Sequence, residues 1–196
     1  IPDLDWLDGL EHATSVWDLL TGNAPVGDEV IVYDGTGRHP APHGAEHAAA
    51  AGSQTTLVSI DGELATELTY AERAVWKRRL YELEVPMSFD HRLTRIARDG
   101  NRLTATFVNE ATGAATTRTA DQIVVEHGTM PLDAIYHELR GHAANNGVTD
   151  LDALVAGQPQ PPGSRPGFEL HRIGDAVASR NIAAAIYDAL RLLKAV

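Results

Sequence analysis

The chain has 196 residues, of which 43% are apolar, and a formal net charge of −11. This length can bury a real core in one or two domains, while the absence of cysteine excludes disulfides, thiol catalysis and cysteine-ligated zinc or iron–sulfur centres from this segment. The acidic balance disfavours binding to nucleic acid or to an anionic membrane. Without a bilayer-length apolar run or a signal-peptide pattern, a cytoplasmic location is expected. The chain starts at Ile1 without a methionine, and we expect it to be a piece of something longer.

The first half of the chain predicts a βαβ unit. An acidic, irregular stretch contains a short predicted helix over 15–21. The almost continuously apolar run 29–34 predicts a strand that is covered on both faces, as in a parallel sheet. A glycine-bearing loop precedes a helix expected over 44–51, and 55–60 is the next predicted strand. Strand, helix and strand within about thirty residues predict a right-handed crossover.

The rest of the chain adds a meander and further helices. A helix is predicted over 70–83, and its basic run 77–79 is interpreted as a solvated face. Proline- and glycine-rich residues make 158–167 the one linker-like segment. The expected fold class is α/β, a three-layer FAD/NAD(P)-binding (Rossmann-like) domain with a parallel sheet plus an antiparallel three-stranded meander. The remaining predicted elements are a returning strand at 85–90, the meander strands 92–98, 103–109 and 115–119, a buried strand at 122–126 and a helix at 133–139.

The C-terminal run 168–194 predicts a nucleotide or flavin site. It indicates a short strand, a turn at Gly174-Asp175 and a helix that starts near Ala176. Glycine at such a turn lets a ligand approach the backbone, and the N-terminus of the helix favours an anionic group such as a pyrophosphate. The Asp175 carboxylate can accept hydrogen bonds from sugar or ribityl hydroxyls. The alternative is a plain helix N-cap that binds no ligand.

A second candidate site follows the first strand of the βαβ unit. Gly35-Thr-Gly37 supplies two glycines of a dinucleotide fingerprint, but Pro40 follows and offers no N–H to a phosphate. The second strand presents Ser59, with Asp61 two positions on, where an acidic residue would bind a ribose hydroxyl. These departures put NAD(P)H binding in doubt, and a turn that binds nothing is the alternative.

The histidines offer weaker candidates. His39, His43 and His47 lie at i, i+4 and i+8, a spacing that could hold zinc on one helical face. Because prolines interrupt the start of this helix, surface histidines are the favoured interpretation. His127 ends a buried strand at the edge of the expected crevice, and a structural role is favoured over a functional one.

Several phrases of the sequence carry a family resemblance. Together with the order of the elements, they resemble the C-terminal portion of the long NADH:flavin oxidoreductases related to old yellow enzyme. That group includes the 2,4-dienoyl-CoA reductases and the trimethylamine and histamine dehydrogenases. The phrases are Trp17-Asp-Leu-Leu-Thr-Gly22, residues 27–34, Gly44-Ala-Glu46, Tyr81-Glu-Leu83 and residues 168–182, whose Gly-Asp-Ala and Arg-Asn-Ile motifs are the most specific.

The resemblance implies a larger polypeptide. A TIM barrel with FMN and a 4Fe–4S cluster would come first, followed by an FAD- or ADP-binding domain that an NAD(P)H-domain-like insertion interrupts. In this chain, 1–27 would be a connecting segment, 28–130 the NAD(P)-binding-like domain, and 131–196 the return into the FAD/ADP-type domain. The implied partners are the barrel and the other FAD/ADP-domain segments of the same parent. A homo-oligomer is left open, and neither nucleic acid nor a membrane is implied.

The same comparison suggests site residues and a function. The chain would be the nucleotide-binding part of a flavin-dependent oxidoreductase that reduces enoyl-type or oxidises amine-type substrates, and it would not turn over alone. The alternatives are a vestigial, non-catalytic Rossmann-like scaffold or interaction domain, and an independent α/β binding module. The expected ligand is FAD or ADP, with NAD(P)H in doubt, and no catalytic or metal-binding residue is assigned. The expected cofactor-binding residues are Gly174, Asp175, Arg180, Asn181 and Ile182 at the C-terminal turn, and Gly35, Gly37, Arg38, Ser59 and Gly128 at the earlier loop.

Overall fold

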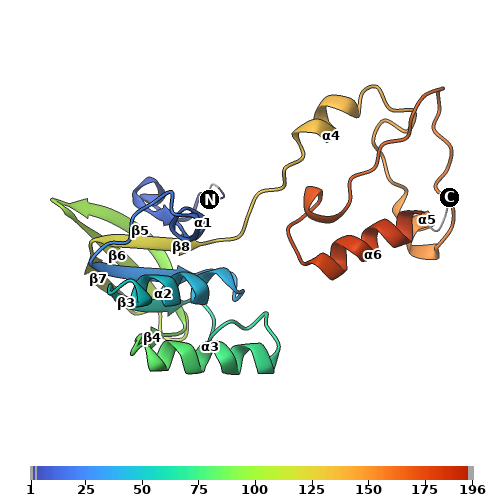
Figure 1. The fold of residues 1–196 in the computed structure, drawn as a ribbon. Helices are drawn as coiled ribbons and strands as arrows, with labels where there is room; N and C mark the ends of the chain where they lie inside the picture. The colour runs from blue at the N-terminus through green and yellow to red at the C-terminus, as the bar shows by residue number, and fades with distance from the viewer. Residues whose placement is uncertain (1, 3, 194–196) are drawn as a thin grey trace. The chain divides into compact units, whose positions relative to one another are not determined.

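The computed structural model describes residues 2 and 4–193, which form two compact units, Ile1–Gly128 and Thr129–Val196 (Figure 1). Within the described residues, no helix has both the length and the apolar character needed to span a membrane.

A five-stranded parallel sheet forms the centre of the first unit. Its strand order is β1-β8-β2-β3-β4, and every neighbouring pair is parallel. The predicted βαβ unit is confirmed, because β2 and β3 are parallel neighbours joined through a helix. The strands are β1 (Thr14–Ser15), β2 (Glu29–Asp34), β3 (Gln54–Ser59), β4 (Met87–Ser88) and β8 (Gln122–Glu126).

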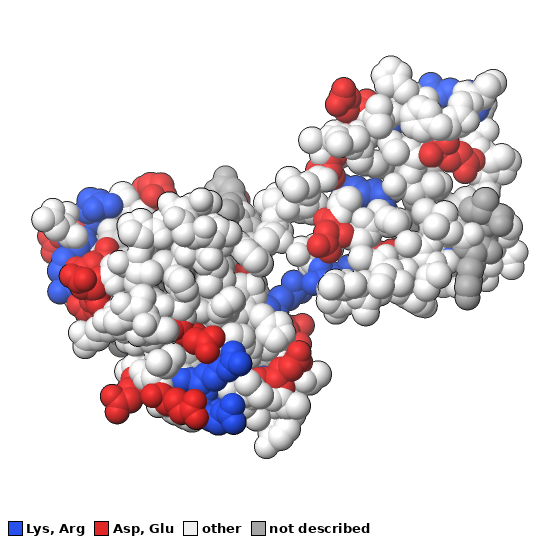
Figure 2. Space-filling model, in the orientation of Figure 1, with Lys and Arg blue, Asp and Glu red and all other residues white. Residues whose placement is uncertain are grey.

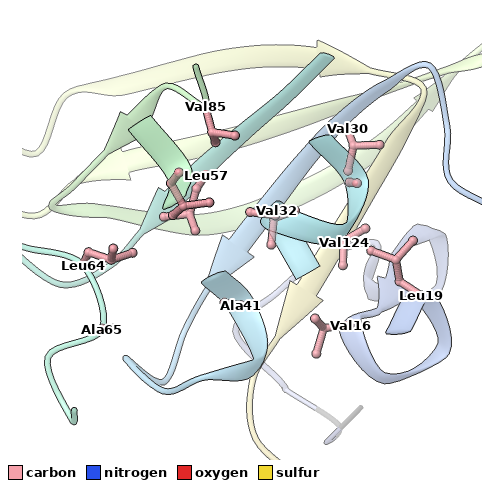
Figure 3. Close-up of a cluster of buried hydrophobic side chains, with 13 residues drawn as sticks. Val16, Leu19, Val30, Val32, Ala41, Leu57, Leu64, Ala65, Val85 and Val124 are labelled. Carbon is pink, nitrogen blue, oxygen red and sulfur yellow. The ribbon is translucent and has the colours of Figure 1, made fainter. Parts of the chain in front are cut away.

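The sheet lies between helices and the meander, as the sequence predicts. The core on one face joins Val30 and Val32 of β2 to residues of α1 (Val16–Thr21) and α2 (Pro40–Ala50) (Figure 3). The other core cluster joins Ile31 and Tyr33 to the antiparallel meander. Since alternate β2 side chains serve opposite faces, the continuous apolar run follows directly from burial on both sides. The meander strands are β5 (His91–Asp99), β6 (Arg102–Asn109) and β7 (Ala115–Ala120), and a 3-10 turn at Leu10–His12 precedes β1.

Helix α2 begins at Pro40, four residues before its predicted start at Gly44. The prolines were expected to interrupt this helix, yet Pro40 occupies its first turn. Proline is well suited to that position, because its fixed φ matches the helix and its missing N–H would have had no partner there.

Gly44 allows α1 and α2 to approach each other. A Cβ on Gly44 would lie 2.7 Å from Cγ2 of the fully buried Val16. Alanine normally stabilises a helix interior relative to glycine, but overpacking should dominate here. We therefore expect Gly44→Ala to lower the free energy of unfolding by about 1 kcal/mol. Urea unfolding would measure this loss, and adding Val16→Ala should restore part of it. A stabilised Gly44→Ala would contradict the expectation.

Helix α3 (Tyr70–Glu82) starts with a capping box between Thr69 and Glu72. On the face shown in Figure 2, basic side chains of the first unit lie next to acidic ones. The helix follows this pattern, since Arg78 pairs with Glu82 and Arg79 with Glu46 of α2. These exposed pairs are consistent with a solvated face, and each adds little stability.

In the second unit, the strand expected after Phe168 does not form, and that prediction is wrong. A strand requires a neighbour for its backbone groups, and no other strand occurs among the described residues of this unit. Instead, Leu170 N–H donates to Asn145 Oδ1 at 3.0 Å and the Asn145 amide donates to Leu170 O at 2.9 Å. The segment 158–167 also lies in this unit, where Arg165 donates to the carbonyl of Ala143. The helices are α4 (Ala134–Leu139), α5 (Leu151–Ala156) and α6 (Ile182–Leu193).

The start of α6 also differs from the prediction. Gly174–Ala176 forms a separate 3-10 turn, and α6 begins at Ile182 instead of near Ala176. Asn181 explains the new start, because its Oδ1 accepts the N–H of Ala184 at 2.8 Å. Asparagine is among the best helix N-caps, so the long helix begins after it.

Candidate nucleotide sites

Three polar residues stand side by side at the carboxyl edge of the parallel sheet. Asp34 at the end of β2 is in register with Ser59 of β3 and with Glu126 of β8. All three are buried. Ligands of open α/β sheets bind outside this edge, so these residues and the loops that follow them form the first candidate site.

Asp34 holds the loop that follows β2. Its Oδ1 accepts the N–H groups of Thr36 at 3.1 Å and Gly37 at 2.8 Å. Its Oδ2 is buried and has no hydrogen-bond partner among the described residues. Burial raises the pKa of Asp34 to about 6, and the nearby charge of Glu126 acts in the same direction, whereas the two backbone hydrogen bonds oppose the shift.

Glu126, on the neighbouring strand β8, also forms hydrogen bonds with this loop. Its Oε1 accepts the N–H of Gly128 at 2.9 Å, and the Thr36 hydroxyl donates to its Oε2. The N–H of Gly35 donates to the Glu126 carbonyl at 2.8 Å. A Cβ on Gly35 would lie 2.6 Å from Nδ1 of His127. Gly35 therefore serves close packing against His127, whereas Gly128 has room for a Cβ and instead adopts a φ of +86°, which favours glycine.

The remaining expected residues of the first unit also contact their own chain. Gly37 is buried with φ +65°, and a Cβ there would lie 2.6 Å from Oδ2 of Asp61. Ser59 Oγ accepts the N–H of Asp61 at 3.1 Å, and the Thr66 hydroxyl donates to the Asp61 carboxylate. Arg38, next to Gly37, is half-buried.

Two of the histidines have structural neighbours. Nδ1 of His39 accepts the indole N–H of Trp76 at 3.0 Å, and its Nε2 lies 3.4 Å from Glu72. The ring of His127 lies between Trp6 and Tyr33, at centroid distances of 5.6 and 5.2 Å. Burial lowers the pKa of His127 to about 4, so the ring is neutral near pH 7. In the described part of the chain, no group of three or more His, Asp or Glu residues could hold a metal ion.

The second candidate site is the turn at Gly174 in the second unit. Gly174 is buried with φ +57°, and its N–H donates to Asp188 Oδ2 at 3.1 Å. Arg180 pairs with the same carboxylate, and this hydrogen bond lowers the pKa of Asp188. Asp175 is exposed, and its Oδ1 accepts the Arg180 N–H at 3.4 Å. The structure thus brings Gly174, Asp175 and Arg180 together, while Asn181 caps α6 and Ile182 is its exposed first residue.

A cavity of about 500 Å³ adjoins this turn. Its wall includes Arg172, Arg180 and Asp188 with apolar side chains such as Val148 and Val177. Asp188 was missed from the sequence. No helical spacing could have shown it, because Arg180 lies before the first residue of α6 and Asp188 within that helix. Asp34 and Glu126 were missed too, although each is an acidic residue that ends an apolar strand.

The chain is similar to several known proteins, although no protein-family model matches it. It is 40% identical over 188 residues to a probable N-methylproline demethylase of Rhizobium meliloti, a match that covers 95% of this chain and 28% of that protein. It is 40% identical to the multifunctional alkene reductase/demethylase OYE of Caballeronia cordobensis, covering 98% of this chain and 29% of the relative. The chain is related to the long flavin oxidoreductases of the old yellow enzyme group.

A further relative is similar in sequence, and two solved structures are similar in fold. An N,N-dimethylglycine/sarcosine dehydrogenase of Chromohalobacter salexigens is 38% identical, with 92% of this chain and 27% of the relative covered. Histamine dehydrogenase from Rhizobium sp. 4-9 superposes with a TM-score of 0.72 at 21% identity, over 96% of this chain and 26% of that one. Thioredoxin reductase of T. acidophilum superposes with a TM-score of 0.63 at 16% identity, over 100% of this chain and 62% of the reductase chain. The fold is therefore that of flavoprotein reductases, and the chain spans less than a third of the curated relatives it matches.

Proposed function

We propose that the chain is the nucleotide-domain portion of a flavin-dependent oxidoreductase that oxidises N-methylated amines or amino acids. The observation that carries the proposal is the 40% identity over 188 residues to the N-methylproline demethylase. The dimethylglycine/sarcosine dehydrogenase supports the same substrate class. The alkene reductase/demethylase favours a second activity, reduction of an activated alkene, at the same flavin.

In this proposal, the chemistry belongs to the parent protein. FMN in a barrel would accept a hydride from the substrate, and a 4Fe–4S cluster would pass electrons onward. The described chain would supply a site for FAD or ADP at the turn of the second unit. Gly174 would allow close approach to the cofactor, Arg180 would balance phosphate charge, and the exposed Asp175 would accept a hydrogen bond from a ribose or ribityl hydroxyl.

The proposed partners are the other segments of the same parent. Among the described residues of the second unit, the only buried hydrophobic residues are Ala143, Ala144 and Leu192. Helix α6 exposes a set of large apolar side chains: Ile182, Ile186, Tyr187, Leu190 and Leu193. Exposed apolar surface of this kind supports contact with another protein surface, and we propose that the FAD/ADP-type domain of the parent provides it.

The binding step can be tested with the full-length protein. FAD and ADP would be titrated by calorimetry and thermal shift, and a ligand at about one hundred times Kd should add roughly 2.7 kcal/mol of stability. Stopped-flow absorbance would follow flavin reduction by N-methylproline and by sarcosine. Failure of both nucleotides to bind would contradict the assigned site, whereas failure of both amines would contradict the substrate class.

Asp175→Ala tests the role of the carboxylate. Because a hydrogen bond to a charged group would be lost, affinity for FAD or ADP should fall about tenfold. The exposed Asp152 of α5 provides a control, since Asp152→Ala removes the same charge within the same unit. Equal affinity in the two variants would remove Asp175 from the site.

A further inference from the structure

In the loop after β2, two backbone N–H groups already donate to a carboxylate of the same chain, that of Asp34. In dinucleotide-binding domains, N–H groups of the loop after the first strand and of the following helix bind the pyrophosphate. Here the N–H groups of Thr36 and Gly37 donate instead to Asp34 Oδ1. A carboxylate oxygen has the same sign of charge as a phosphate oxygen and accepts the same hydrogen bonds.

The start of α2 offers few replacement donors. Pro40 and Pro42 both stand in its first turn, and neither has an N–H. An incoming phosphate would therefore have to displace the Asp34 carboxylate. That side chain is fully buried and stands beside the buried Glu126, so a second anion would also meet like charge.

The neighbouring loop closes the region where a ribose would be recognised. The Asp61 carboxylate accepts the Thr66 hydroxyl, and Glu67 N–H donates to the Gly37 carbonyl at 3.0 Å. Leu64 and Ala65 are buried in the same core cluster that contains residues of β2 and α2 (Figure 3). The two loops that would receive a dinucleotide thus bind each other.

We infer that Asp34 acts as an internal anion that occupies the phosphate position of the first unit and closes this unit to NAD(P)H. The inference concerns only the first unit and is independent of FAD or ADP binding in the second. In the flavin oxidoreductase proposed above, the electrons would then come from the oxidised substrate and would not be supplied by a nicotinamide in this crevice.

The test uses the full-length protein with saturating ADP, which fills the separate nucleotide site. Wild type, Asp34→Ala and Asp99→Ala would be titrated by calorimetry with inorganic pyrophosphate and with NADPH. Asp34→Ala frees two N–H groups and removes a charge, so its affinity for pyrophosphate should be at least tenfold higher than that of wild type. Asp99 is exposed at the β5–β6 turn, and Asp99→Ala, with the same charge change, should behave as wild type.

A folded Asp34→Ala that gains no pyrophosphate affinity overturns the inference, as does an equal gain in Asp99→Ala. Asp34→Ser is the second opening variant if the alanine variant does not fold. In the wild-type titration, absence of binding at millimolar NADPH is the expected result, and saturable NADPH binding overturns the inference whatever the variants show. Loss of ADP binding would instead contradict the proposed function and leave the first unit unaffected.

Discussion

Asp34→Asn should remove the stability that wild type gains in mild acid from protonation of Asp34. In wild type, the folded-state pKa of Asp34 is about 6, above the ordinary value of 3.8. The folded state therefore binds this proton first, and Asp34 adds stability as the pH falls from about 6 to 4. A shift of this size corresponds to about 3 kcal/mol. Asp34→Asn removes that gain, while its side-chain oxygen can still accept the two backbone N–H groups.

The measurement is urea unfolding followed by tryptophan fluorescence. In the 196-residue chain, all three tryptophans belong to the first unit (Trp6, Trp17 and Trp76), so unfolding of this chain gives a signal from that unit alone. Between pH 6 and 4, the difference in unfolding free energy between wild type and Asp34→Asn should change by about 3 kcal/mol in favour of wild type. Parallel pH profiles of the two proteins would show that the carboxyl does not titrate in this range.

His127→Phe should have the opposite effect over nearly the same pH range. The folded-state pKa of His127 is about 4, below the ordinary value of 6.5, because the ring is buried. Its contribution to stability is fully present above pH 6.5 and is lost as the pH falls toward 4. That loss is about 3 kcal/mol in wild type, and a phenyl ring cannot be protonated. His127→Phe should therefore gain about this much relative to wild type as the pH falls from 6.5 to 4.

In wild type, the effects of Asp34 and His127 on the free energy of unfolding should largely cancel between pH 6 and 4. Asp34 favours the folded state in mild acid, and His127 disfavours it, so neither is evident from the wild-type profile alone. The double variant should again resemble wild type in slope, and this comparison controls for the exposed carboxylates that titrate in all four proteins. Slopes of the same sign in the two single variants would contradict the opposed shifts.

The layered fold of the first unit could be predicted because its signals are local. The run 29–34 is apolar at successive positions since both of its faces are covered, and the meander alternates because only one face is. The closing of the crevice could not be predicted in the same way. The hydrogen bonds from Thr36 and Gly37 to the Asp34 carboxylate are local, but the sequence does not show whether a turn aspartate keeps these N–H groups or leaves them to a ligand. The burial of Asp34 beside Ser59 and Glu126 depends on the register of β2 with β3 and β8, which is not a local signal.

The second unit was harder to predict for a physical reason. Phe168 and the residues after it have the composition of a strand, but a strand forms only where another chain segment supplies hydrogen bonds. The start of α6 was misplaced because Asp175 and Asn181 are both good N-caps, and the choice between them depends on contacts such as that of Gly174 with Asp188. The Gly-Asp-Ala and Arg-Asn-Ile phrases nevertheless led to the correct relatives.

The strand order also determines when the first unit can be completed during synthesis. Strand β8 is the last of its strands to be made, yet it lies between β1 and β2. Until Gln122–Glu126 has left the ribosome, one side of β2 has unpaired backbone groups, and an exposed edge of this kind promotes aggregation. A truncated product that ends before Gln122 should therefore accumulate as insoluble material, whereas one that extends through Gly128 contains every strand of the sheet.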